Sequence, residues 1–275
     1  MIIDEPPLGF RGTYRSKPQP IHDTFMWHPF DILGDELFVD KTLRDSDAPS
    51  HCRLVYSERI TRWFKDKSDQ NNQWPPTVDR KPGVQISRRI DGDRMRLEVL
   101  HEWQLMIRHL LSATMDGSAR GWRSPESWSA QVTFSNIRNG REFLPEIRET
   151  GSWSGGRLEQ VSQGAENSIT QSGEARSLAS VYALLANFPR PDEISSIGST
   201  TLLEEGFTVT PDVTLLRCPE NLQKHPMAAG LDGYALRGKG NFPADYWVNR
   251  QGLVVFVCMG PHRAFVLESL ETLPS

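Results

Sequence analysis

The chain has 275 residues, of which 37% are hydrophobic and 24% charged, and its formal net charge is -4. This composition is that of a globular chain, which excludes intrinsic disorder, and the acidic balance argues against a general nucleic-acid binder. No stretch approaches the ~20 apolar residues of a membrane span, and the N-terminus lacks the features of a secretory signal. We therefore expect a cytoplasmic protein with no membrane span and no nucleic-acid partner.

The first half of the chain is predicted to consist of short strands. Val84 and Ile86 alternate with polar residues before Asp91-Gly92, and the alternation resumes after this dipeptide. Asp-Gly between two alternating runs predicts a β-hairpin, because glycine accepts the positive φ of the tight turn. A second such pattern surrounds Asn139-Gly140, and residues 100–111 are predicted to form a strand that bends or continues, not a long helix.

One helix and a set of closing strands are predicted in the second half. Apolar residues recur at helical spacing from Leu178 to Leu185, and Pro189 ends this helix. Further strands surround turns at Gln251-Gly252 and Gly260-Pro261, and Cys258 is predicted to face a core. About fifteen short strands with one helix predict an all-β barrel or sandwich.

Two short motifs raise the question of an internal duplication. Gly12-Thr13-Tyr14 and Gly151-Ser152-Trp153 each place a glycine two residues before an aromatic residue, about half the chain apart, although matches this short also arise by chance. After the second motif come the predicted helix, an apolar run ending in Leu216-Arg217-Cys218-Pro219, and a closing hairpin.

These features resemble a two-part lipocalin-like family of unknown function known from cyanobacteria and plastids. In that family each half carries Gly-x-Trp, and an apolar strand ends in an L-x-C-P step. The second half matches better, since Tyr14 stands where the family has tryptophan and residues 59–80 are unlike it. The resemblance implies an all-β fold of lipocalin-like antiparallel barrels, with tandem halves at 1–149 and 150–275 and one connecting helix.

The three cysteines, Cys52, Cys218 and Cys258, lie far apart and form no CxxC pair, which argues against a thiolate zinc site or a redox pair. Pro219 supplies no donor to a β-ladder, so Cys218 is predicted to end a strand and to be structural. As a nucleophile it would need a neighbouring histidine or cation to lower its pKa. We expect free, buried thiols and neither a metal nor a cofactor.

Standard catalytic motifs are absent, since no GxGxxG, Walker A, HExxH or complete G-x-S-x-G occurs. Polar and aromatic residues on predicted strands are the remaining candidates to line a barrel pocket. His28 and His101 are candidates for proton transfer, and Tyr234 is a candidate donor to a developing oxyanion. For His101 the alternative is a hydrogen-bonded core histidine. The candidate ligand-binding residues are Trp27, Trp103, Arg237 and Tyr246.

Three classes of function fit the sequence. The first, implied by the resemblance, is a cofactor-free cyclase or isomerase of secondary metabolism that binds an apolar terpenoid or polyketide-type intermediate in a β-barrel cavity. Orientation of the substrate could lower its barrier without a covalent nucleophile. The second is a non-catalytic carrier of a small molecule or pigment, and the third is a scaffold or interaction module without ligand. A titratable group with a perturbed pKa inside a cavity would favour the first over the second, whereas a filled barrel would favour the third.

Overall fold

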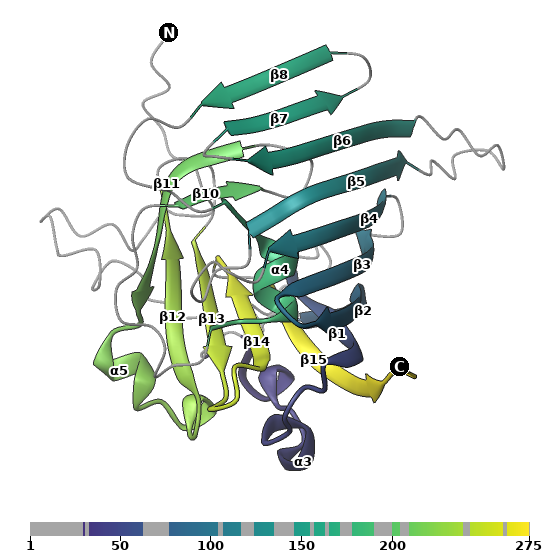
Figure 1. The fold of residues 1–275 in the computed structure, drawn as a ribbon. Coiled ribbons are helices and arrows are strands. Elements are labelled where there is room, and N and C mark those ends of the chain that lie inside the picture. Colours follow the sequence, from purple (N-terminus) through teal and green to yellow (C-terminus); the bar gives the residue numbers. More distant parts are fainter. Residues whose placement is uncertain are drawn as a thin grey trace, which may run out of the picture.

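In the computed structural model, the strands of the chain form one large sheet (Figure 1). The structure describes residues 30, 33–62, 77–103, 107–116, 124–134, 146–154, 157–162, 165–170, 178–189, 200–203, 209–238, 243–260 and 263–274. Gly12-Thr13-Tyr14, the Asn139-Gly140 turn, Trp27 and His28 lie outside these ranges.

The first part of the sheet contains eight strands in chain order. These are β1 (His51–Arg62), β2 (Thr77–Asp91), β3 (Arg94–Trp103), β4 (Ile107–Asp116), β5 (Ser124–Phe134), β6 (Glu146–Ser154), β7 (Arg157–Ser162) and β8 (Ala165–Thr170). The second part contains β9 (Leu178–Ser180), β10 (Thr200–Leu203), β11 (Val209–Arg217), β12 (Asp232–Arg237), β13 (Ala244–Val248), β14 (Val254–Met259) and β15 (Arg263–Thr272).

The two parts are joined by hydrogen bonds between β1 and β15, which pair antiparallel over residues 52–60 of β1. The strand order is β8-β7-β6-β5-β4-β3-β2-β1-β15-β14-β13-β12-β11-β10-β9, and every pair is antiparallel except β9 with β10. The all-β prediction is therefore confirmed. Among the described strands the sheet does not close into a barrel, because β8 and β9 form its two ends. Position 149/150 falls within β6, and the division into tandem halves stays a prediction.

The local turn predictions are confirmed where the turns are described. Asp91 pairs with Arg94 across the β2–β3 turn, and Gly92 has φ 56°. Gly252 and Gly260 have φ 85° and 64° in the turns before and after β14. The run from 100 to 111 is strand at both ends and not a long helix, as predicted, but it belongs to two strands, β3 and β4, that pair antiparallel, and not to one strand that bends or continues.

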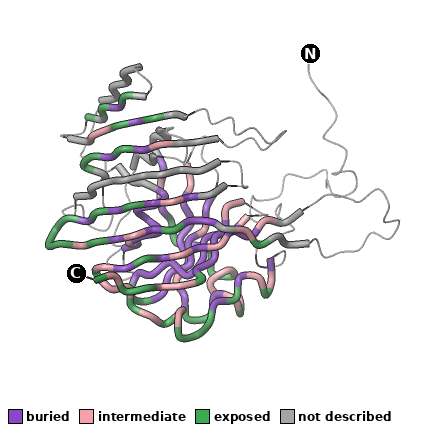
Figure 2. Tube along the Cα trace, turned by 90° about the vertical axis from the view of Figure 1, so that its right-hand side faces the viewer, coloured by how far each residue is buried: buried purple, intermediate pink, exposed green. Residues whose placement is uncertain are grey.

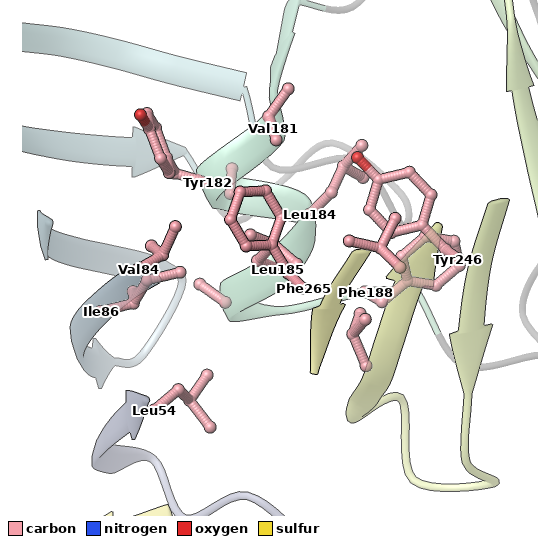
Figure 3. Close-up of a cluster of buried hydrophobic side chains, with 14 of the residues drawn as sticks. Leu54, Val84, Ile86, Val181, Tyr182, Leu184, Leu185, Phe188, Tyr246 and Phe265 are labelled. Carbon is pink, nitrogen blue, oxygen red and sulfur yellow. The ribbon is translucent and has the colours of Figure 1, made fainter. Parts of the chain in front are cut away.

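The predicted connecting helix is α4 (Val181–Ala186), and all six of its residues are buried. It is shorter than predicted, because Leu178 belongs to β9, whose backbone pairs in parallel with β10. Figure 3 shows α4 between β1–β3 on one side and the C-terminal strands on the other, with Leu54, Val84 and Phe265 directed at it. The face of the sheet on this side is called the inner face below.

Polar side chains of β1 and β2 bond to the C-terminal end of α4. The Tyr56 hydroxyl lies 3.1 Å from the carbonyl oxygen of Leu185, and Arg88 Nη1 donates to the carbonyl of Ala186 at 2.5 Å. The other terminal nitrogen of Arg88 donates to the carbonyls of Ala48 and Pro49. The last carbonyls of a helix have no partner within it, so a buried helix end depends on such donors.

A second core lies on the outer face of the C-terminal strands. There residues 30 and 33–44, with η1 (Gly34–Leu37) and α3 (Lys41–Arg44), pack with residues 218–231, which include α5 (Glu220–Gln223) and η3 (Pro226–Ala228). The rings of Phe30 and Trp247 are 4.9 Å apart, measured between centroids. Since β14 is covered on both faces, five of its six residues are buried, and Cys258 faces a core as predicted. Figure 2 shows buried residues, in purple, lying close together in the lower half of the molecule.

Candidate functional site

His101 is fully buried on the inner face of β3. Its Nδ1 lies 3.0 Å from the hydroxyl oxygen of Tyr182 on α4, and its ring meets Phe265 edge to face with centroids 5.5 Å apart. This is the environment of a hydrogen-bonded core histidine. A role for His101 in proton transfer stays a prediction.

Tyr234 and Tyr246 are brought together as direct partners on β12 and β13. Both are buried, and the ring of Phe188, just after α4, lies 5.4 Å from each of their rings (Figure 3). The guanidinium carbon of Arg217 lies 5.7 Å from the Tyr234 ring centroid. Figure 3 shows Tyr246 on the other side of α4 from the ring of Tyr182, which is the partner of His101, so the structure does not place the Tyr234–Tyr246 pair beside His101.

Arg237 ends β12 and is bonded within its own hairpin. Its guanidinium donates to the carbonyls of Leu236 and Ala244 and forms an ion pair with Asp245 at 2.5 Å. Burial raises the pKa of Asp245, and the charge and hydrogen bond of Arg237 oppose this shift. Trp103 is the last residue of β3, and its side chain, like Trp27 and His28, lies outside the description.

Cys218 follows the last residue of β11 and is buried, which confirms the prediction of a strand end at Pro219. Burial raises the pKa of its thiol well above the usual range, and the negative charge of Asp245 raises it further. A thiol in this state is a poor nucleophile. Cys52 and Cys258 are likewise free and buried, as predicted.

Glu149, a buried carboxyl group on β6, was not among the site residues predicted from the sequence. Glu149 is 1% exposed and lies directly opposite Ala130 of β5, on the inner face. Its Oε1 accepts a hydrogen bond from Trp128 Nε1 at 2.7 Å, and its Oε2 accepts one from Gln160 Nε2 on β7. Burial raises the pKa of Glu149, and these two hydrogen bonds offset part of the rise. No described Lys, Arg or His forms an ion pair with it.

The glycine of the Gly-x-Trp motif makes room for this arrangement. Gly151 is the direct β6 partner of Trp128, and a Cβ at Gly151 would lie 2.0 Å from Trp128 Cζ2. Gly233 and Trp247 repeat the relation on β12 and β13, where an added Cβ would lie 2.6 Å from the indole. Each glycine therefore accepts a cross-strand indole over its Cα.

A period-2 pattern around Glu149 could have revealed it. Ile147, Glu149, Gly151 and Trp153 alternate with polar residues, so a carboxylate shares the face of apolar neighbours. A buried acid with a raised pKa and no counter-ion is typical of sites where protons are exchanged.

A shallow hollow of about 620 Å³ lies over β1–β6. Most of its lining residues alternate with buried ones along their strands, so it lies mainly on the outer face. Its side chains are largely hydrophilic, and they include Arg53, Gln85, Ser87, Glu98, Gln131 and Thr150. It is therefore not the apolar interior cavity that the sequence predicted.

Two absences concern the described part of the chain alone. No group of three or more His, Cys, Asp or Glu side chains in these ranges is arranged to hold a metal ion. No helix there has the length and apolar character needed to cross a membrane. The predicted location and partners stay predictions.

Comparison with known proteins yields a fold likeness alone. No family model matches the chain, and no curated protein matches it significantly. Among solved structures it is similar to a beta-barrel-like protein of a domain of unknown function, DUF1849, from Brucella abortus, at 10% identity and a TM-score of 0.45. The match covers 83% of this chain and 100% of that one. At this level of similarity the match carries no inference about activity.

Proposed function

We propose that the protein binds an apolar terpenoid or polyketide-type intermediate against the inner face of β5–β7 and isomerises or cyclises it without a cofactor. The observation that carries this proposal is Glu149, a buried carboxyl with a raised pKa and no described counter-ion. The resemblance of the sequence to lipocalin-like proteins supports the same class of ligand. Because α4 and its neighbours fill the space between β1–β3 and the C-terminal strands, we assign the ligand to the β5–β7 end.

Glu149 would act first as an acid and then as a base. The carboxylic acid adds its proton to one carbon of a double bond, which leaves a carbocation at the other carbon. A second double bond of the same molecule attacks this cation, and the carboxylate then removes a proton from the neighbouring carbon. Atoms and charges balance, so the product is an isomer of the substrate. The raised pKa increases the protonated fraction of Glu149, and the N–H of Trp128 stabilises the carboxylate that forms.

The test combines a ligand search with one substitution. Organic extraction of the purified protein and native mass spectrometry would identify a retained compound, and this compound and a panel of polyenes and terpenoids would be assayed for conversion. Glu149→Gln is expected to lower kcat by about 10²- to 10⁴-fold. Glu159→Gln is the control, because Glu159 is exposed on the neighbouring strand β7.

Three outcomes separate the candidates. Normal turnover by the Glu149→Gln variant would overturn the role of Glu149. A compound that is retained but never converted would instead indicate a carrier. A protein that takes up none of the panel would support a scaffold, the function that the α4-filled core favours.

A further inference from the structure

The hollow on the outer face of β1–β6 follows one row of residues across the sheet, in which serine and threonine predominate. Direct cross-strand partners form this row through six strands, as Arg53, Ser87, Glu98, Ser112, Ser129 and Thr150. Five of the six line the hollow, including the first and the last. Neighbouring strands lie about 4.8 Å apart, so the row spans about 24 Å and the hollow is an elongated groove.

The groove can hold a ligand only through side chains. Each strand from β1 to β6 is hydrogen-bonded to a neighbour on both edges, so none has a free edge for pairing with an extended chain. Longer side chains flank the row on one side, and among them Gln85, Gln131 and Arg148 line the hollow. The lining therefore offers hydroxyl, amide and charged groups to a ligand, and no described lining residue is aromatic.

Two arginines flank the row on its other side without a counter-ion in the described part of the chain. Arg89 of β2 and Arg96 of β3 are direct partners, and both are exposed. Neither forms an ion pair with a described residue, whereas Arg94 on the same face of β3 pairs with Glu126. Like charges directly opposite each other on a sheet are destabilising, so a bound anion would be favourable at this position.

We propose that this groove binds an oligosaccharide of uronic acids, with one carboxylate between Arg89 and Arg96 and the sugar hydroxyls along the row. Sugar hydroxyls can donate to the carboxylate of Glu98, and they can donate to and accept from the serine and threonine hydroxyls. A neutral sugar would have no aromatic ring to stack on in the described lining, so the contact of the carboxylate with the arginines supplies most of the affinity. The inference does not depend on the proposed isomerase activity.

Two probes that differ in charge test the proposal. Tetragalacturonic acid carries a carboxylate on every sugar unit, and its fully methyl-esterified form keeps the ring hydroxyls without the charges. By isothermal titration calorimetry, the wild-type protein is expected to bind the acid about 10- to 100-fold more tightly than the ester. Added salt should reduce this ratio, because exposed charges are screened. Equal binding of the two forms, or no binding of the acid, would overturn the proposal.

Substitutions on β3 locate the carboxylate. Arg96→Gln is expected to weaken binding of the acid by about tenfold or more with little change for the ester. It also removes a like-charge repulsion, so the urea midpoint should stay equal or rise, which a merely structural role for Arg96 would not allow. Arg94→Gln is the control, because Arg94 lies on the same strand and face and already has a partner. Equal losses in the two variants, or a preference that survives Arg96→Gln, would overturn the assignment to this pair.

Three further measurements test the groove and the kind of ligand. Ser129→Leu places a larger side chain in the row and is expected to weaken binding of both sugar forms, and unchanged binding would overturn the groove as the site. Tetraglutamate lacks the ring hydroxyls and is expected to bind more weakly than the acid, so equal or tighter binding would overturn the assignment to a sugar. Sodium sulfate that binds as tightly as the acid would indicate a site for an anion alone and would overturn the elongated ligand. The comparison of probes on the wild type decides the proposal even if a variant fails to fold.

Discussion

Substitution of Gly151 by alanine tests how the Gly-x-Trp motif supports the Glu149 cluster. The added Cβ would lie 2.0, 2.3 and 2.6 Å from three atoms of the Trp128 indole, and real Cβ contacts are not this short. The ring must therefore move off β6. Overpacking of this kind costs about 1–3 kcal/mol.

Movement of the indole also affects Glu149. Trp128 Nε1 donates to Glu149 Oε1 at 2.7 Å, and loss of this bond leaves a buried acceptor unpaired, which costs about 1–3 kcal/mol more. We expect Gly151→Ala to lower the free energy of unfolding by about 2–6 kcal/mol. Urea denaturation at constant pH measures this change, with an unchanged m-value as the sign that only stability has altered.

A second background isolates the clash. Phenylalanine at position 128 lacks both the larger indole ring and the N–H donor. In the Trp128→Phe protein, Gly151→Ala is therefore expected to change the free energy of unfolding by less than about 1 kcal/mol. The reasoning is refuted if alanine at 151 is equally destabilising in both backgrounds, or if it is neutral in the wild type.

Three further predictions concern other buried polar groups. Arg88→Met should lower the free energy of unfolding by about 3–5 kcal/mol, because the carbonyls of Ala186, Ala48 and Pro49 lose their donor. Arg89→Met, on the exposed face, should change the free energy of unfolding by under about 0.5 kcal/mol. Similar urea midpoints for the two variants would contradict this prediction. The pKa of Glu149 is raised above 4.5 in the folded protein, so between the unfolded and the folded pKa the folded state retains a proton that the unfolded state releases. The contribution of Glu149 to the free energy of unfolding therefore falls as the pH rises through this interval. The stability of Glu149→Gln relative to wild type should therefore increase with pH above about 4.5, and a constant difference across a urea series from pH 4 to 8 would refute the assignment. The three buried thiols should react with a disulfide reagent at pH 8 only after denaturation, so a rapid reaction of native protein would show that Cys218 is accessible.

Local signals in the sequence determined the hairpins and the strand ends. Asp91-Gly92 turns the chain because glycine tolerates positive φ, and Pro219 ends β11 because proline cannot donate to the ladder. The position of α4 followed from helical spacing, but its start did not, since the pairing of Leu178 with β10 overrides local propensity. These features depend on residues that are close in the chain.

Local signals in the sequence determined the candidate sites only in part. Alternation places Glu149 on an apolar face, and it places His101 on one face of β3. It does not say which side chains lie above each face. Tyr182 reaches His101 from 81 residues away.

Tertiary structure decided what covers each face of the sheet. The pairing of β1 with β15 brings the two parts of the chain into one sheet, and it places an ion pair between Glu58 and Arg263 on the inner face. Strand periodicity is a property of the local backbone, so the sequence by itself determines which residues share a face. Burial, hydrogen-bond satisfaction and pKa depend on contacts between residues far apart in the chain, and these exist only once the sheet has assembled.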